Sequence, residues 1–84
     1  MPYSVSILRR AQKELADLPL HEYPRVASAL RALADDPRPH RCAKLTARDG
    51  WRIRVGNYRV LFDVDDSRRT VTVVHVGNRR DVYR

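Results

Sequence analysis

Residues 51–62 read WRIRVGNYRVLF, and this stretch decides the fold. Large apolar residues recur at every second position on both sides of a glycine-asparagine pair at positions 56–57, which is the pattern of two half-buried strands. The pair fits a two-residue hairpin turn of the type that places glycine first. We therefore predict an antiparallel hairpin made of residues 51–55 and 58–64.

The predicted hairpin sorts its side chains onto two faces, because successive side chains of a strand point to opposite sides. One face is apolar and is expected to belong to the core: Trp51, Ile53, Val55, Tyr58, Val60 and Phe62. The other face carries Arg52, Arg54 and Arg59, with Arg54 and Arg59 directly opposite each other. A register slip of one residue would turn the arginines into the core, so we expect this register to hold.

Three arginines on one strand face predict an anion-binding surface. Like charges placed opposite each other destabilise a sheet by about 0.2–1 kcal/mol, and the acidic residue of the hairpin, Asp63, lies further along the second strand. A cluster of this kind gains from a bound anion. The alternative is a solvated strand face whose arginines extend into water.

The sequence on the C-terminal side of the hairpin predicts a third strand. Residues 65–69 are polar and suit a turn, and residues 70–76 are rich in β-branched side chains. Gly77-Asn78 is expected to end this strand and to leave a short basic tail. If the strand pairs across a five-residue turn, His75 joins the arginine face.

The first half of the chain predicts a strand and two helices. Residues 3–7 alternate apolar and polar side chains, as a half-buried strand does. Residues 8–18 and about 21–35 carry apolar residues at three- and four-residue spacings and predict helices, which Pro19 and Pro37 end. The stripes expected to face the core are Leu8, Ala11, Leu15 and Leu18 in the first helix and Tyr23, Val26, Ala27, Leu30, Leu33 and Ala34 in the second.

Together these patterns predict a single α+β domain over residues 1–84 with the order β-α-α-β-β-β. Residues 37–50 contain prolines, a glycine and many charges, and they are interpreted as a loop with a turn of structure around Lys44-Leu45. The strands form a twisted antiparallel sheet. The helical hairpin packs on one face of it, because no other segment can bury the apolar face of the strands. Trp51 is interpreted as a core residue rather than a base-stacking platform.

Charge is the first indication of function. Seventeen basic residues against ten acidic ones give a net charge of +7 over 84 residues. A basic domain of this size attracts polyanions such as nucleic acid, the ribosome or an acidic protein. All the basic residues except Lys13 and Lys44 are arginines, which suit bidentate phosphate contacts, although genome base composition is an alternative cause of this excess.

The composition also disfavours several classes of protein. The single cysteine, Cys42, excludes an intramolecular disulfide. The sequence has no apolar run long enough to span a membrane, and residues 1–4 lack the apolar core of a signal peptide. The spacings of cysteine and histidine match no metal site. We expect a soluble cytoplasmic protein in a reducing compartment, with no membrane segment and no metal site.

Three stretches of the sequence resemble the RelE-type toxins of the RelE/ParE superfamily, which belong to bacterial type II toxin–antitoxin pairs. They are Lys44-Leu45, residues 50–62 and the ending VGNRRDVY at residues 76–83. The first half of the chain also resembles these toxins, at Arg10-Ala11, at Leu18-Pro19 and at residues 36–39, where the second predicted helix ends. The resemblance covers nearly the whole chain and implies a small twisted antiparallel sheet with a helical hairpin packed on it.

The resemblance implies an activity that inhibits translation. RelE-like toxins enter the ribosomal decoding site and cleave messenger RNA in the A site. The RNA's own 2′-OH attacks the adjacent phosphate, which leaves a 2′,3′-cyclic phosphate and a 5′-OH without a metal or cofactor. Such chemistry requires that the 2′-OH lose a proton, that the crowded phosphate be stabilised and that the leaving 5′ oxygen gain a proton.

The site residues of RelE-like toxins have matching positions in this chain. Arg59 matches the arginine that stabilises the phosphate. Arg79 matches the residue that assists the leaving oxygen, and Tyr83 matches a tyrosine that stacks on or orients a base. Arg52 and Arg54 match positions at which well-studied members carry lysines.

Because arginine stands at positions 52 and 54 in place of lysine, the identity of the general base is an open question. An arginine, whose pKa lies above about 12, is a poor base, so Arg54 is expected to contribute charge instead. Asp81 and His75 are the candidate bases. Alternatively, the ribosome positions the 2′-OH and no strong base is required. The residues expected to contact RNA or the ribosome are Arg52, Arg54, Lys44 and Arg80.

The resemblance also implies a partner and leaves alternatives. RelE-like toxins are neutralised by a cognate antitoxin, here expected to be RelB-like, in a hetero-oligomeric complex, and the +7 charge suits an acidic antitoxin segment. A ParE-like toxin of the same fold would inhibit DNA gyrase and cut no RNA. A non-catalytic RNA- or ribosome-binding module would bind phosphate with a steep salt dependence. A toxin that has lost its activity would serve only its antitoxin.

Overall fold

The computed structural model describes residues 2–78 of the chain. Its helices and strands follow the predicted order, with one short strand added inside the predicted loop. They are β1 (Ser4–Ile7), α1 (Arg9–Ala16), α2 (Tyr23–Ala32), β2 (Ala43–Lys44), β3 (Trp51–Val55), β4 (Tyr58–Asp65) and β5 (Thr70–Asn78). The prediction of an α+β fold is confirmed.

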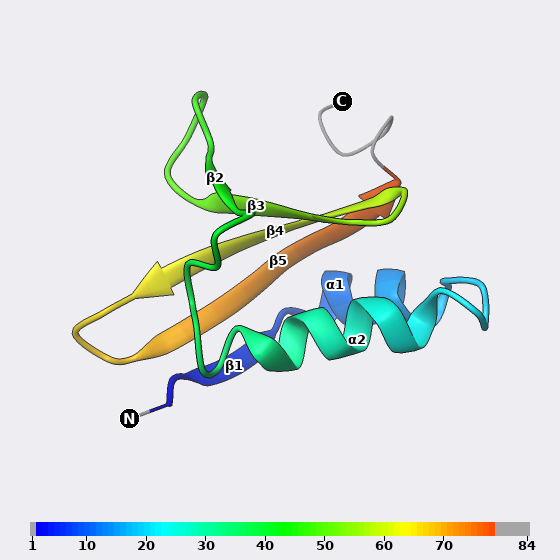
Figure 1. Ribbon diagram of the computed structural model, residues 1–84, viewed down its shortest axis with the longest axis horizontal. Helices are drawn as coiled ribbons and strands as arrows, with labels where there is room; N and C mark the ends of the chain where they lie inside the picture. Colours follow the sequence, from blue (N-terminus) through cyan, green and yellow to red (C-terminus); the bar gives the residue numbers. More distant parts are fainter. Residues whose placement is uncertain (1, 79–84) are drawn as a thin grey trace.

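The strands form one five-stranded sheet in the order β1-β5-β4-β3-β2 within the described residues (Figure 1). β2, β3, β4 and β5 pair in antiparallel fashion, as predicted. β1 runs parallel to β5, with Ser4 opposite Thr70, so the sheet is mixed and the prediction of an antiparallel sheet is wrong for this strand. The two helices carry the chain from the end of β1 to the far edge of the sheet, so no tight turn requires β1 to reverse direction.

The β3–β4 hairpin has the predicted register. Val55 pairs with Tyr58, and Arg54 lies opposite Arg59. Gly56 adopts a φ of +60°, whereas Asn57 keeps a negative φ, so glycine occupies the turn position that needs the left-handed region. The two-residue turn therefore fixes which side chains of both strands face the core.

β5 differs from its prediction at two places. It does not end at Gly77-Asn78 but continues through both residues, because Tyr58 and Arg59 at the start of β4 supply ladder partners for them. The register also shifts between Leu61 and Phe62, whose partners are His75 and Val73. The extra residue in β5 is Val74, a β-bulge that turns the following side chains over.

The bulge decides which face His75 occupies. The β4–β5 turn leaves four residues, 66–69, between the paired Asp65 and Thr70, rather than the predicted five. A continuous ladder from that turn would place His75 opposite Val60, on the core face. With the bulge, His75 lies opposite Leu61, and Leu61 lies opposite Arg52. His75 therefore lies on the same sheet face as Arg52, Arg54 and Arg59, as predicted, but it does so because of the bulge and not because of a five-residue turn.

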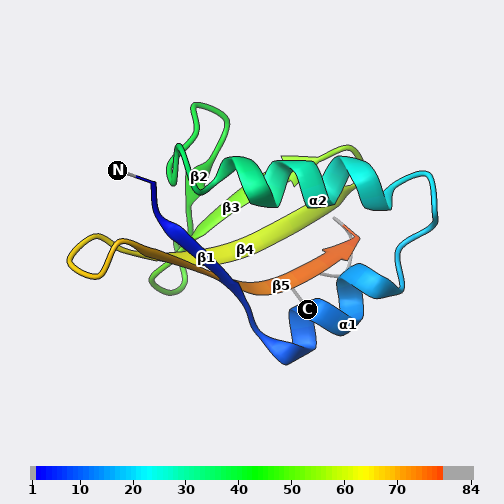
Figure 2. The ribbon, with the colours of Figure 1, turned by 90° about the horizontal axis from the view of Figure 1, so that it is seen from below.

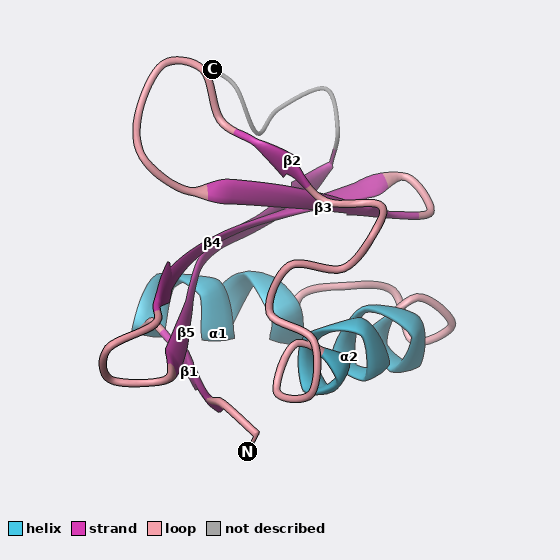
Figure 3. Ribbon diagram, turned by 60° about the vertical axis from the view of Figure 1, so that its left-hand side comes forward, coloured by secondary structure: helices cyan, strands magenta, loops and turns pink. Residues whose placement is uncertain are grey.

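Both helices pack on one side of the sheet, α2 across β3 and β4 and α1 beside β5 (Figures 2 and 3). The core between them and the sheet comprises Ala11, Leu15, Val26, Ala29, Leu30, Leu33, Ile53, Val55, Val60, Phe62, Val71, Val73 and Val76. Five residues of the predicted stripes lie outside this cluster: Leu18 packs against it, Ala27 is buried elsewhere, Ala34 is half-buried, and the other two are exposed. Leu8 precedes α1 and is 47% exposed, and Tyr23 starts α2 and is 44% exposed. Neither helix in the described part of the chain is long and apolar enough to cross a membrane.

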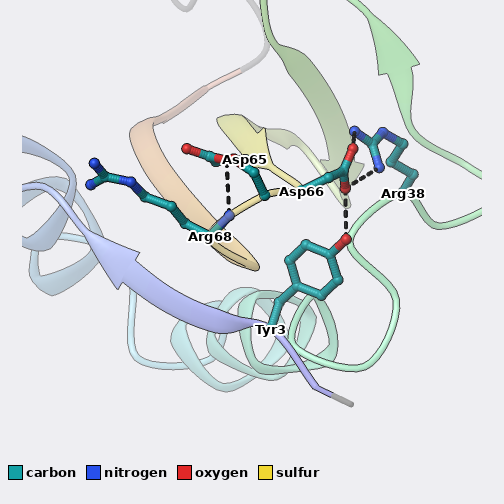
Figure 4. Close-up of polar contacts among 6 residues, drawn as sticks. Tyr3, Arg38, Asp65, Asp66 and Arg68 are labelled. Carbon is teal, nitrogen blue, oxygen red and sulfur yellow. Dashed lines mark hydrogen bonds and ion pairs between the residues drawn. The ribbon is translucent and has the colours of Figure 1, made fainter.

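A polar cluster ties three distant segments together beside this core (Figure 4). The Asp66 carboxylate, in the β4–β5 turn, accepts a 2.6 Å hydrogen bond from the Tyr3 hydroxyl and 2.8 and 3.0 Å hydrogen bonds from the Arg38 guanidinium. The Arg38 guanidinium also lies 5.4 Å from the ring centroid of Trp51, a cation–π distance. Trp51 is half-buried and packs against the core, as predicted. The hydrogen bonds from Arg38 and Tyr3 lower the pKa of Asp66 to about 2.

This lowered pKa gives the fold a specific pH dependence. Because the folded-state pKa of Asp66 lies below the ordinary value of 3.8, its carboxylate stabilises the fold above about pH 4 and loses that effect as the pH falls toward 2. We expect Asp66→Asn to unfold at a lower temperature than the unsubstituted protein at neutral pH, and the difference to vanish near pH 2. Thermal unfolding followed by circular dichroism measures it.

Asp35→Asn, at an exposed aspartate beyond α2, is the matched control and should leave the unfolding temperature unchanged at both pH values. An equal loss of unfolding temperature for Asp66→Asn at neutral pH and near pH 2 would contradict the role assigned to the carboxylate charge.

Candidate functional site

The sheet face turned away from the helices carries the three predicted arginines. Pairing across β3, β4 and β5 puts Arg52, Leu61 and His75 in one row and Arg54 and Arg59 in the next. Arg54 is exposed, whereas Arg52 and Arg59 are half-buried. We call this surface the arginine face; it consists of Arg52, Arg54, Arg59 and His75.

A shallow pocket of ≈270 Å³ opens at one end of the arginine face. Its lining comprises Lys44, Leu45, Thr46, Arg52 and Arg59. Three of these side chains are cationic and one carries a hydroxyl donor, and the described residues that line the pocket include no carboxylate. Guanidinium groups recognise phosphate oxygens in bidentate fashion, and lysine adds a point charge. The pocket therefore suits a phosphate group.

The short strand β2 brings Lys44 to this pocket. β2 pairs with the start of β3, where Lys44 lies opposite Trp51. The loop that follows closes with a 2.9 Å hydrogen bond from the Leu45 N–H to the Gly50 carbonyl. Gly50 has a φ of +128°, and a Cβ there would lie 2.9 Å from Asp63 Oδ1, so glycine lets the loop return against β4. The turn of structure predicted around Lys44-Leu45 is thus a strand and a tight loop.

A larger pocket of ≈510 Å³ lies on the other side of Lys44. Arg38 and Arg48 contribute to its lining, but so do Asp49 and Asp63. The negative charges of these two carboxylates partly cancel the positive charges in the lining, so this second pocket is a weaker anion site than the first.

His75, at the β5 side of the arginine face, has an unexpected neighbour on α1. Its Nδ1 atom lies 2.6 Å from Glu14 Oε2, and the other carboxylate oxygen accepts a 2.9 Å hydrogen bond from the Val76 N–H. Nδ1 is buried, and the approach of Oε2 is close but not aligned as a hydrogen bond in these rotamers. We treat the two groups as partners because of the 2.6 Å separation between Nδ1 and Oε2.

Glu14 could not be found from the sequence. It lies on α1 among residues whose spacing indicates only an amphipathic helix, and its contacts are more than sixty residues away along the chain. A salt bridge of 3.5 Å with Arg10, one turn earlier, is the one local signal, and such pairs are common on helix surfaces.

Four of the predicted site residues, Arg79, Arg80, Asp81 and Tyr83, lie outside the described residues. The remaining five fall on one sheet face or at its end. Arg52, Arg59 and Lys44 meet in one pocket, Arg54 lies beside Arg59, and His75 lies in the row of Arg52.

Comparisons with known proteins agree with this architecture. Residues 5–83 match the family model described as "ParE toxin of type II toxin-antitoxin system, parDE". The toxin RelG of Mycobacterium tuberculosis is 36% identical over 90 aligned positions, which cover all of this chain and 99% of RelG. The toxin RelE of the same organism is 32% identical over 89 positions, covering 99% of this chain and 88% of that toxin.

A solved structure shows the same fold. The archaeal RelE–RelB complex from Pyrococcus horikoshii OT3 contains a chain that superposes with a TM-score of 0.84 at 27% identity, covering 98% of this chain and all of the other. The family match spans nearly the whole chain, and the relatives match over their full or almost full length. The chain therefore belongs to the RelE/ParE family of toxins from type II toxin–antitoxin systems, and it is of the RelE type.

Proposed function

We propose that this toxin is an endoribonuclease that cleaves messenger RNA in the ribosomal A site and so inhibits translation. The observation that carries the proposal is the pocket of Lys44, Arg52 and Arg59, a cationic site on a basic sheet face. The identity to the toxins RelG and RelE supports it. The RNA would supply its own nucleophile, the 2′-OH, and no metal or cofactor enters the proposed reaction.

The pocket supplies the electrostatic part of this reaction. As the 2′ oxygen attacks, negative charge builds on the phosphate oxygens, and preorganised cations stabilise that charge more than they stabilise the starting phosphodiester. Arg59 and Arg52 are the proposed ligands of the phosphate because both are half-buried and line the pocket. Lys44 and the exposed Arg54 are proposed to add contacts to the neighbouring RNA or ribosome.

The proton transfers are assigned to residues on either side of the pocket. His75 is the proposed general base. It lies diagonally across from Arg59 on the neighbouring strand, and a bound ribose can bridge the separation of about 7–8 Å between such diagonal neighbours. Arg79 is proposed to assist the leaving 5′ oxygen, Tyr83 to orient a base and Arg80 to contact RNA. Asp81 is the alternative base, and an Asp81→Asn variant that cleaves at the normal rate would remove it.

We further propose that a RelB-like antitoxin neutralises the toxin in a hetero-oligomeric complex. The Pyrococcus horikoshii structure contains a RelE together with a RelB, and the net charge of +7 on this chain favours a partner segment that is acidic.

The first test compares cleavage by the unsubstituted protein and by Arg59→Ala. Purified protein is added to programmed ribosomes and to free mRNA, and 5′ ends are mapped by primer extension. We expect cuts in the A site on ribosomes only, and a rate about 10²–10³-fold lower for Arg59→Ala, as for other groups that stabilise developing charge. Arg31→Ala removes the same charge from an exposed position on α2, on the other side of the sheet, and should cleave normally.

Intact mRNA in every lane would contradict the proposed function. The next assay would then be DNA gyrase supercoiling, since the matching family model carries the ParE description. Equal losses of cleavage rate in Arg59→Ala and Arg31→Ala would instead support cleavage by the protein but reject the pocket as the site of that cleavage.

A second test removes the nucleophile. A 2′-deoxy substitution in the nucleotide that precedes the cut should abolish cleavage at that position, because no 2′-OH remains to attack the phosphate, whereas a deoxy substitution one codon upstream should have no effect. Products of the unmodified mRNA should carry a 2′,3′-cyclic phosphate and a 5′-OH. Cleavage of the deoxy-substituted mRNA at the normal rate would reject 2′-OH attack.

A further inference from the structure

The Glu14 carboxylate joins α1 to β5 at the point where the sheet loses its edge strand. β1 pairs with β5 from Thr70 to Val73, and the Leu8 N–H makes the last hydrogen bond of this edge, 3.0 Å to the Val73 carbonyl. Beyond it, Glu14 Oε1 accepts the Val76 N–H in place of a strand. One carboxylate oxygen is sufficient for this capping role.

The second oxygen of Glu14 is directed to His75. Oε2 lies 2.6 Å from Nδ1, and the two side chains are only 24% and 13% exposed. The β-bulge at Val74 and the helix α1 are both required for this contact, since the bulge turns His75 away from the core and α1 sets the carboxylate at the sheet edge. A carboxylate held against one imidazole nitrogen fixes the ring orientation and its tautomer.

We propose that Glu14 is a positioning residue that holds the neutral His75 ring as the Nδ1–H tautomer, so that Nε2 is the nitrogen able to take a proton from an RNA 2′-OH. The inference rests on the proposed ribonuclease function. The 2′-OH proton passes to Nε2 as the bond from the 2′ oxygen to phosphorus forms and the bond from phosphorus to the 5′ oxygen breaks. The 5′ oxygen takes a proton from water, and the imidazolium then gives its proton to the hydroxide that remains.

The charges around the ring suit this cycle. Glu14 on α1 places a carboxylate against the ring on which the positive charge forms, and the Arg10 guanidinium lies 3.5 Å from Glu14 Oε2 on the same helix. From the sheet, Arg59 on β4 and Arg52 on β3 face the same side as His75.

Two measurements on the same variants test the proposal. Nitrogen-15 NMR of the imidazole, at a pH where the ring is neutral, reports which nitrogen carries the proton, and His75→Gln identifies the His75 signals. Single-turnover cleavage on programmed ribosomes reports the reaction. The variants are Glu14→Ala, Glu14→Gln, His75→Gln and the double variant of Glu14→Ala with His75→Gln. Glu22→Ala, at a glutamate that pairs with Arg25 on α2, is the matched control.

We expect Nδ1–H in the unsubstituted protein and in Glu22→Ala, and mainly Nε2–H in Glu14→Ala. Cleavage should fall about 10²-fold in His75→Gln and about 10-fold in Glu14→Ala, as carboxylate partners of histidine typically contribute. Glu14→Gln keeps one of the two acceptor oxygens and should lie between Glu14→Ala and the unsubstituted protein. The double variant should cleave at the rate of His75→Gln, because Glu14 acts through the ring.

Two outcomes overturn the proposal. One is an unchanged Nδ1–H tautomer in Glu14→Ala. The other is a further loss of about 10-fold when Glu14→Ala is added to His75→Gln, which would mean that Glu14 acts through the fold alone. Failure of the proposed function looks different: the unsubstituted protein then leaves mRNA intact, and the tautomer measurement still decides whether Glu14 sets the ring.

Discussion

The pairing of β4 with its neighbours on both sides is the constraint on which the rest of the molecule depends. On one side, the two-residue turn at Gly56 locks β4 to β3 and places Arg54 opposite Arg59. On the other side, the bulge at Val74 resets β5 and brings His75 to the same face. Because side chains alternate along each strand, these two local features decide which groups reach the core and which reach a ligand.

Packing of the apolar face of the sheet offsets the repulsion between the arginines on the other face. Cations opposite each other disfavour the sheet by a few tenths of a kcal/mol to about 1 kcal/mol. Phe62, Val60 and Ile53 on the opposite side are essentially fully buried under the helices, and burial of such side chains contributes roughly 1.5–3 kcal/mol each. Core packing therefore outweighs the repulsion and lets the protein hold a preorganised cationic pocket, which is what electrostatic stabilisation of a phosphate requires.

The parts of the fold that local pattern controls could be predicted from the sequence. The alternation of residues 51–62 and the short turn define the β3–β4 register, and the proline-bounded apolar stripes define the two helices. The arginine face follows from the same pattern. The RelE-type resemblance identified the family, which the comparisons confirm.

The parts that depend on tertiary contacts could not be predicted. Nothing local indicates that β1 lies parallel to β5, since both helices and the other three strands lie between them along the chain. Gly77 and Asn78 look like a strand end but are kept extended by β4. No local pattern marks the bulge at Val74, and the contact of Glu14 with His75 joins two residues that are far apart along the chain. The sequence therefore predicts the cationic residues of the candidate site and His75 beside them, whereas the contact of His75 with Glu14 depends on packing.

The most direct test of the proposed phosphate site is to locate the RNA bound to the protein. Electron cryomicroscopy of the protein on ribosomes programmed with an A-site codon that carries 2′-O-methyl groups would trap the complex before cleavage. We expect the phosphate after the blocked nucleotide to lie in the pocket, within about 3 Å of the guanidinium nitrogens of Arg52 and Arg59, with Lys44 beside it. An A-site phosphate bound elsewhere, with the arginine face turned toward solvent, would contradict it.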